Sequence, residues 1–142
     1  MKIEFAPFPN TKQAPFILTS PKTSSYNCIA WACGDNTKWY WPDASNIYFW
    51  PNDVPREETI DSFIKLFEKF GYSICDNGDY EVEFEKVAIY GTSESIPTHA
   101  ARQLPDGTWT SKLGQNVDVS HSIFSMSDGD YGNVLIYLKR EI

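Results

Sequence analysis

Basic residues are few in this sequence, and they form no run. Twelve Lys and Arg stand against nineteen Asp and Glu in 142 residues, which gives a formal net charge of −7. Because phosphate groups repel an acidic surface, this balance argues against nucleic acid as the main partner. We therefore expect no nucleic-acid partner.

Long hydrophobic runs are also missing. No stretch approaches the ~20 apolar residues of a membrane span. Pro7, Pro9 and Pro15 interrupt the segment in which a signal peptide would lie. We expect no membrane partner and a cytoplasmic location, with export by a leaderless route as an open alternative. The sequence leaves the oligomeric state open.

Cysteine is scarce, and its spacing is irregular. The three cysteines contain no C-x-x-C pair, and Cys28 and Cys33 are five residues apart, which is unusual for a zinc site. No glycine-rich phosphate loop occurs, and the acidic turns lack the spacing of a calcium-binding EF-hand loop. We expect reduced thiols, no disulfide framework, no metal and no cofactor.

The remaining composition is that of a folded protein. Hydrophobic residues make up 42% of the chain and aromatic residues 15%. A chain of this length is most simply one domain over residues 1–142, with enough residues to bury a core. Residues 1–23 contain four prolines and little periodicity, so we expect an extended lead-in there.

Two helices are predicted in the first half of the chain. The first spans about 26–33, with Ser24 or Ser25 as its cap and Gly34 at its end. A long loop rich in aromatic residues follows. In "REETIDSFIKLFEKFGY" the apolar residues fall at i, i+3, i+4 and i+7, which predicts a buried helical stripe that ends at Gly71.

The second half of the chain predicts strands. "EVEFEKVAIYG" alternates in part, and "NVLIYLKR" places Val134, Ile136 and Leu138 on one face. "THAARQL" and "TWTSKL" flank "PDG", which predicts a hairpin. The order is helix, loop, helix and then an antiparallel sheet of about four strands, so the predicted fold class is α+β.

Cys28 would lie in the first turn of its helix. Unpaired N–H groups and the positive helix end stabilise a thiolate there, so we expect its pKa to fall. The backbone N–H of Cys28, with the Asn27 side chain, is the candidate oxyanion support. His99, at the start of a hairpin strand, is the candidate general base.

A third residue that orients the histidine would come from the neighbouring strand. The turn at Pro105–Gly107 brings residues 111–115 beside His99, which offers Ser111 and Gln115, with Asp118 just beyond. A slip of one residue in strand register exchanges the two faces of the sheet. The choice among these polar residues therefore stays open.

Four stretches of the chain follow one another in a familiar order: "YNCIAWACGDNTKWYWP", "THAARQLPDGTWTSKLG", "VDVSH" and "DYGNVLIYLKR". On these stretches the chain resembles papain-like cysteine peptidases, and within them a group of small bacterial proteins. The resemblance implies a papain-like fold with the Cys-bearing N-terminal helix packed on the sheet. It implies Cys28 as nucleophile and His99 as base, with Ser111, Asp118 and His121 near the site.

Other interpretations remain beside this one. His121 is an alternative base, or it pairs with Asp118 as a structural group. Any of the three cysteines can be core filler, which is the interpretation we give to Cys33 and Cys75. Trp31 and the loop residues Trp39 and Trp41 are candidate substrate contacts, although bulky rings also pin long loops to a core.

The sequence thus predicts a thiol-dependent hydrolase or acyltransferase that acts on an amide of a peptide or protein, which includes isopeptide bonds and glutamine side chains. Cysteine peptidase and amidase are the nearest activity classes. The alternative is a non-catalytic carbohydrate- or peptide-binding domain, or an interaction domain, that uses the aromatic loop 39–50.

Overall fold

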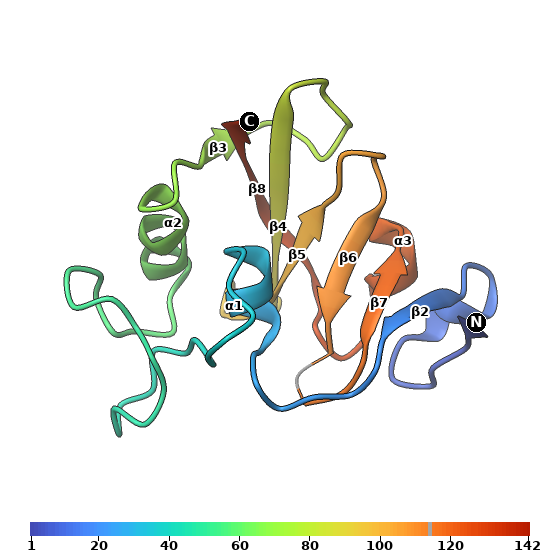
Figure 1. Ribbon diagram of the computed structural model, residues 1–142, viewed down its shortest axis with the longest axis horizontal. Helices are drawn as coiled ribbons and strands as arrows, with labels where there is room; N and C mark the ends of the chain where they lie inside the picture. Colours follow the sequence, from blue (N-terminus) through green and yellow to red (C-terminus); the bar gives the residue numbers. More distant parts are fainter. Residues whose placement is uncertain (114) are drawn as a thin grey trace.

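An antiparallel sheet of eight strands forms the centre of the computed structural model, which describes residues 1–113 and 115–142 (Figure 1). The strands lie in the order β1-β2-β7-β6-β5-β4-β8-β3. Their bounds are β1 Lys2–Ile3, β2 Phe16–Ser20, β3 Ser73–Cys75, β4 Phe84–Gly91, β5 Pro97–Gln103, β6 Trp109–Lys112, β7 Asp118–His121 and β8 Asn133–Glu141. The helices are η1 Pro9–Lys12, α1 Cys28–Ala32, α2 Ile60–Glu68 and α3 Ile123–Met126.

The predicted papain-like α+β fold with a sheet of about four strands is wrong. The sheet has eight strands, and the described helices are short, so the protein is rich in β-structure. The lead-in over residues 1–23 contains β1 and β2, and β2 pairs with β7 through Leu18 and Val119. Short strands such as these carry too few residues for an alternating pattern to be recognised.

The two predicted helix positions both contain helices, although each helix is shorter than expected. Gly34 and Gly71 adopt positive φ angles of 86° and 90° just beyond α1 and α2, a conformation that ends a helix at little cost for glycine. Thr59 caps α2 by accepting a hydrogen bond from the Ser62 N–H. The apolar stripe of α2 is buried through Phe63, Leu66 and Phe67.

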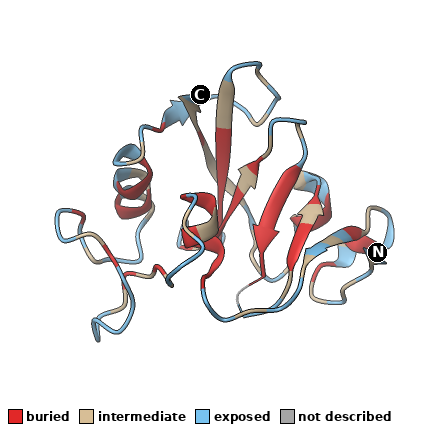
Figure 2. Cartoon of the chain, viewed as in Figure 1, coloured by how far each residue is buried: buried red, intermediate tan, exposed pale blue. Residues whose placement is uncertain are grey.

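The core is divided between the two faces of the sheet, because successive side chains in a strand point to opposite sides. On one face, Ile89 and Ala100 pack with α1, α2 and the aromatic loop. On the other face, Tyr90 and Ala101 pack with the N-terminal segment and residues of α3. Figure 2 shows the buried residues concentrated in α1 and the middle strands of the sheet.

Strands β5 and β6 separate at one end, and this separation positions the site. Among the described residues they pair only through Arg102 with Thr110 and Gln103 with Trp109. The first half of β5 therefore lacks a backbone partner on its β6 side. Helix α1 packs against both strands at this point (Figure 1). Its first residue is Cys28.

Substitution of Phe16 tests whether the N-terminal segment is part of the folded core. Its side chain is fully buried and packs against Phe8 and His121, whereas Ile17, the next residue in β2, is 45% exposed. Phe16→Ala is expected to lower the free energy of unfolding by about 3–5 kcal/mol. Ile17→Ala, the matched control, is expected to cost less than about 1 kcal/mol. Urea unfolding measures both, and equal costs would contradict the placement of β2.

Candidate active site

Asn27 fixes the start of α1 and ties the aromatic loop to it. Its Oδ1 accepts hydrogen bonds from the N–H groups of Ala30, at 3.2 Å, and Tyr40, at 3.0 Å. Its Nδ2 donates to the Tyr40 carbonyl at 2.6 Å. The sequence suggested this side chain as oxyanion support, which would need its Nδ2 as donor; the structure has that donor engaged with Tyr40 and the oxygen engaged as helix cap and loop anchor.

Cys28 follows this cap and is only 6% exposed. Burial raises the pKa of its thiol to about 11, although hydrogen bonds from the backbone of Ala100, Ile29 and Cys28 itself, and the charge of Lys112, act to lower it. The expectation of a lowered thiol pKa is therefore wrong. A helix of five residues offers a weak dipole, and desolvation outweighs it.

His99 is held from two sides inside the sheet. Its ring is fully buried and stacks on Tyr131 with 4.1 Å between centroids and 3° between planes. Tyr90 meets its edge at 5.7 Å. Thr98 holds Tyr131 in place by donating its hydroxyl to the Tyr131 carbonyl at 2.6 Å. The imidazole therefore has one orientation fixed by packing.

A single hydroxyl connects the two histidines of the chain. Ser111 Oγ lies 2.9 Å from His99 Nε2 and 2.7 Å from His121 Nε2. His121 Nδ1 lies 2.8 Å from the Ser122 carbonyl oxygen. A carbonyl only accepts, so His121 carries its proton on Nδ1 and presents a bare Nε2 to Ser111.

The proton positions on His99 follow from this arrangement. Ser111 has one hydrogen and donates it to His121 Nε2, so its oxygen must accept from the Nε2–H of His99. His99 therefore has a bare Nδ1. That nitrogen is buried and has no hydrogen-bond partner among the described residues. An unpartnered basic nitrogen in a rigid ring is the arrangement that a general base needs.

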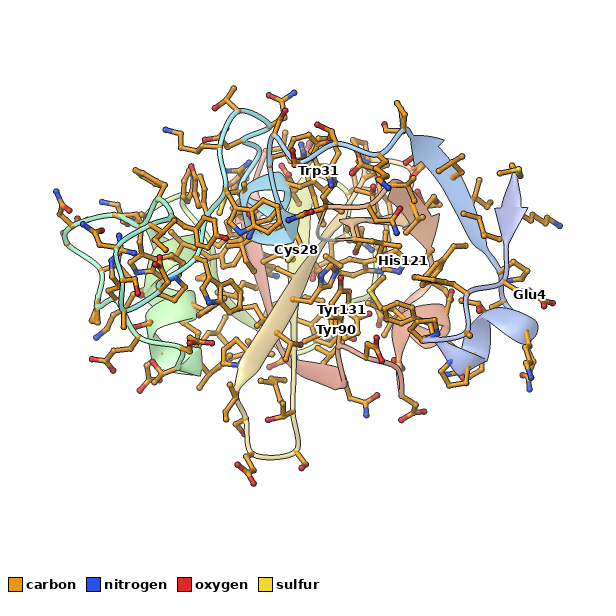
Figure 3. All side chains as sticks on the ribbon, turned by 90° about the horizontal axis from the view of Figure 1, so that it is seen from below. Glu4, Cys28, Trp31, Tyr90, His121 and Tyr131 are labelled. Carbon is orange, nitrogen blue, oxygen red and sulfur yellow. The ribbon has the colours of Figure 1, made fainter. Side chains whose placement is uncertain are left out.

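Cys28 contacts the strand that carries this base, although its sulfur makes no hydrogen bond to the His99 ring. Its sulfur is hydrogen-bonded to the backbone of Ala100, the residue after His99. Its charge also raises the pKa of Tyr131, which stacks on His99, although desolvation is the larger cause. Figure 3 shows Cys28, Tyr131 and His121 gathered in the middle of the molecule, whereas Glu4 lies at its edge. Helix α1 thus packs against β5 and β6, the strands that carry His99 and Ser111.

Both histidines stay neutral at ordinary pH. Burial lowers the pKa of His99 well below its usual value, and the charge of His121 lowers it further. Burial also lowers the pKa of His121 to about 4, against a smaller upward effect of its bond to Ser122. The resting site therefore holds a neutral thiol and two neutral imidazoles.

Asp118 is near the site but bonds elsewhere. Its Oδ2 accepts the Tyr26 hydroxyl at 2.6 Å, and its Oδ1 is buried without a partner. Lys112, also buried, donates to the backbone carbonyls of Thr23 and Asn116. Among the described residues, no carboxylate hydrogen-bonds to either histidine. The structure therefore places Ser111, and not Asp118, beside His99.

The three tryptophans predicted to contact a substrate, Trp31, Trp39 and Trp41, pack against other side chains of the protein. Trp31 is half-buried between Tyr26, at 5.8 Å, and the Arg102 guanidinium, at 5.3 Å. Trp41 is half-buried and meets the edge of Phe63 on α2 at 5.5 Å. Trp39 stacks beside Tyr48 at 5.7 Å, and this pair is the more exposed one.

A family model described as "Domain of unknown function (DUF7689)" matches residues 17–139. The chain belongs to this family. The match contains β2 except for Phe16, both histidines, Cys28 and Ser111, so the DUF7689 region includes the whole candidate site. Gly114, which closes one of the stretches used for the papain-like resemblance, lies outside the described residues. No curated protein and no solved structure matches the chain.

Sequence reasoning missed Tyr131 of the DUF7689 domain. Its stack on His99 depends on a turn that precedes β8, more than thirty residues downstream, and no local pattern signals it. Among the described residues, no group of three or more His, Cys, Asp or Glu side chains could hold a metal ion, and no helix is long and apolar enough to span a membrane.

The neutral histidines predict that acid destabilises the DUF7689 domain. Burial lowers the folded-state pKa of His121 to about 4, against 6.5 for a histidine in water. Below pH 6.5 the unfolded chain binds more protons than the folded one, so stability falls as the pH drops. His121 alone is expected to contribute a loss of about 2 kcal/mol between pH 7 and pH 5.

The wild type is compared with His121→Gln, because the two proteins have the same carboxyl groups and differ in the titration of residue 121. Urea unfolding at the two pH values should show a smaller loss for the variant, by about 2 kcal/mol. An equal loss in both proteins would show that His121 is not buried in its neutral form.

Proposed function

We propose that this protein is a cysteine-dependent hydrolase or acyltransferase that acts on an amide of a peptide or protein. The observation that carries the proposal is the bare, buried Nδ1 of His99 on the strand whose next residue hydrogen-bonds to Cys28. A thiol and a fixed base on neighbouring elements are the minimal parts of covalent acyl transfer, and the proposal requires that the two come together when a substrate binds.

In the proposed reaction, Cys28 Sγ attacks the substrate carbonyl while His99 Nδ1 takes the thiol proton. An S–C bond forms, and the backbone N–H groups at the start of α1 support the negative oxygen. The C–N bond then breaks, and His99 Nδ1–H gives its proton to the leaving amine. Water or another nucleophile attacks the thioester and restores the thiol, which yields hydrolysis, deamidation or transfer.

The resting thiol is neutral. We therefore propose that His99 removes its proton during the attack on the substrate, and that the site does not hold a thiolate–imidazolium pair beforehand. Burial raises the pKa of Cys28 to about 11 and lowers that of His99, so the proton stays on sulfur until a substrate arrives. Since a thiolate is the stronger nucleophile, the base must take the proton during the attack.

A binding domain without catalysis has less support. Tyr40 and Trp50 of the aromatic loop are buried, and Trp41 packs on Phe63. The rings that remain exposed, Tyr48 and Phe49, lie beside Trp39 and Tyr40. The loop thus resembles a packed cover more than an open carbohydrate platform. We further place the protein in the cytoplasm, where its three free cysteines would stay reduced.

Acylation by p-nitrophenyl acetate tests the proposal without knowledge of the natural substrate. In a background with Cys33→Ser and Cys75→Ser, the expected result is one acetyl group on Cys28, located by mass spectrometry. His99→Gln keeps the size of the side chain and a donor for Ser111 but has no base. It is expected to acylate at least about 100-fold more slowly.

Cys28→Ser is expected to remove the modification from this position, and circular dichroism checks that each variant is folded. Acylation elsewhere, or an equal rate in folded His99→Gln, would remove the catalytic proposal.

A further inference from the structure

A continuous path of hydrogen bonds leads away from His99 on the side opposite its bare nitrogen. It runs from His99 Nε2 on β5 to Ser111 Oγ on β6, at 2.9 Å, and then to His121 Nε2 on β7, at 2.7 Å. It ends at the Ser122 carbonyl, 2.8 Å from His121 Nδ1. All three side chains are buried.

We propose that Ser111 and His121 form a proton relay that carries the positive charge from His99 to His121 while Cys28 reacts. This inference rests on the proposed function, because it assigns the groups behind its general base. Ser111 and His121 are positioning and relay residues, and His99 is the proposed general base for Cys28.

The proton count of the relay balances. The Cys28 proton moves to His99 Nδ1, the His99 Nε2 proton moves to Ser111 Oγ, and the Ser111 proton moves to His121 Nε2. The products are a sulfur that bonds to the substrate, a neutral His99 in its other tautomer and a His121 imidazolium. Both hydrogen bonds of Ser111 survive with their directions reversed, so no heavy atom has to move.

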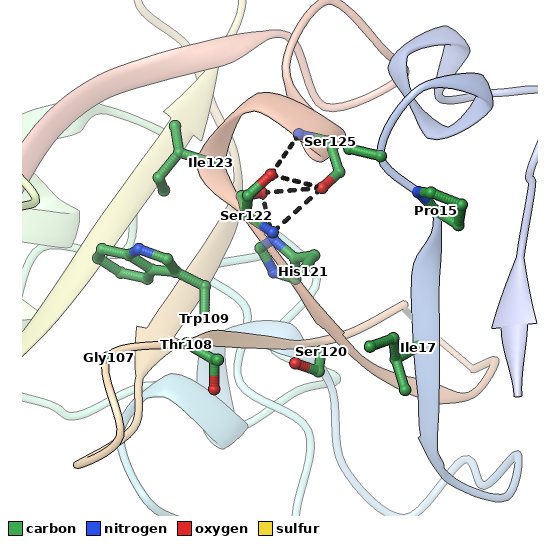
Figure 4. Close-up of a pocket in the computed structure, with 11 residues that line it drawn as sticks. Pro15, Ile17, Gly107, Thr108, Trp109, Ser120, His121, Ser122, Ile123 and Ser125 are labelled. Carbon is green, nitrogen blue, oxygen red and sulfur yellow. Dashed lines mark hydrogen bonds between the residues drawn. The ribbon is translucent and has the colours of Figure 1, made fainter.

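The surroundings of His121 suit a positive charge better than those of His99. His121 borders a cavity of about 500 Å³ that Trp109, Ile123 and Ser125 also line (Figure 4). As an imidazolium it would donate both N–H groups to oxygen atoms, one of Ser111 and one of Ser122. Solvent in the cavity reduces the cost of the charge.

The Ser122 carbonyl, which accepts the hydrogen bond from His121 Nδ1, is held in place by its own contacts. Ser122 caps α3, and its side chain and backbone exchange hydrogen bonds with Ser125 in a capping box, as Figure 4 shows. His99, in contrast, faces the rings of Tyr90 and Tyr131, the only other ionisable groups that the described residues place in ring contact with it. Neither ring accepts its charge.

His121→Gln tests the relay in the Cys33→Ser, Cys75→Ser background. Glutamine keeps an acceptor for the Ser111 hydroxyl but cannot hold the proton. Acylation of Cys28 by p-nitrophenyl acetate is expected to slow on the order of tenfold or more, while still depending on His99. Ser111→Ala, a second variant, breaks both bonds and is expected to slow the reaction at least as much.

Rates in mixtures of H2O and D2O distinguish a relay from a merely structural role. Several protons in flight give the wild-type rate a curved dependence on deuterium fraction, and His121→Gln is expected to give a straight line. Ser120→Ala serves as the matched control, because Ser120 lines the same cavity and lies outside the path. It is expected to keep the wild-type rate and curvature.

The outcomes separate the two proposals. Wild-type rate and curvature in folded His121→Gln would overturn the relay and leave Cys28 and His99 as the reacting pair. An absence of Cys28 acylation in the wild type would overturn both. Nitrogen-15 spectra of the resting protein add an independent check, since a proton on His121 Nε2 instead of Nδ1 would also overturn the relay.

Discussion

The site depends on the fact that the Ser111 hydroxyl has one hydrogen and two buried imidazole neighbours. It can donate to only one of them, and the Ser122 carbonyl decides which one by requiring the proton on His121 Nδ1. That single choice leaves His99 Nδ1 without a proton. A backbone carbonyl at the end of β7, two strands away from β5, thus determines the protonation state of the unpartnered nitrogen of His99.

The fold supplies this arrangement by leaving part of the sheet unpaired. Where β5 and β6 separate, α1 packs against both strands, and Asn27 holds the first turn of α1 in place. The close fit has an electrostatic cost, since it removes water from the thiol. Backbone donors from Ala100 and Ile29 offset only part of that cost, which explains why the helix start alone does not produce a thiolate.

Local patterns in the sequence predicted the elements that are long or capped. The α2 stripe ending at Gly71, the β5–β6 hairpin around Gly107 and the final strand β8 all carry such signals. The short strands β1, β2, β3 and β7 carry no such signal. The sequence therefore predicted about four strands, whereas the sheet has eight. The hairpin turn placed Ser111 among the candidates beside His99 but did not separate it from Gln115 and Asp118. The hydrogen bond of His121 to Ser111 and the stacking of Tyr131 on His99 depend on tertiary contacts that no local pattern encodes.

The burial of Cys28 also bears on its resistance to oxidants. Peroxide reacts with exposed thiolates, and this sulfur keeps its proton and has almost no exposed surface. The resting protein should therefore survive oxidative stress with the sulfur still reduced, in contrast to enzymes that store a thiolate. The same property hides it from surveys that find reactive cysteines by their speed of labelling.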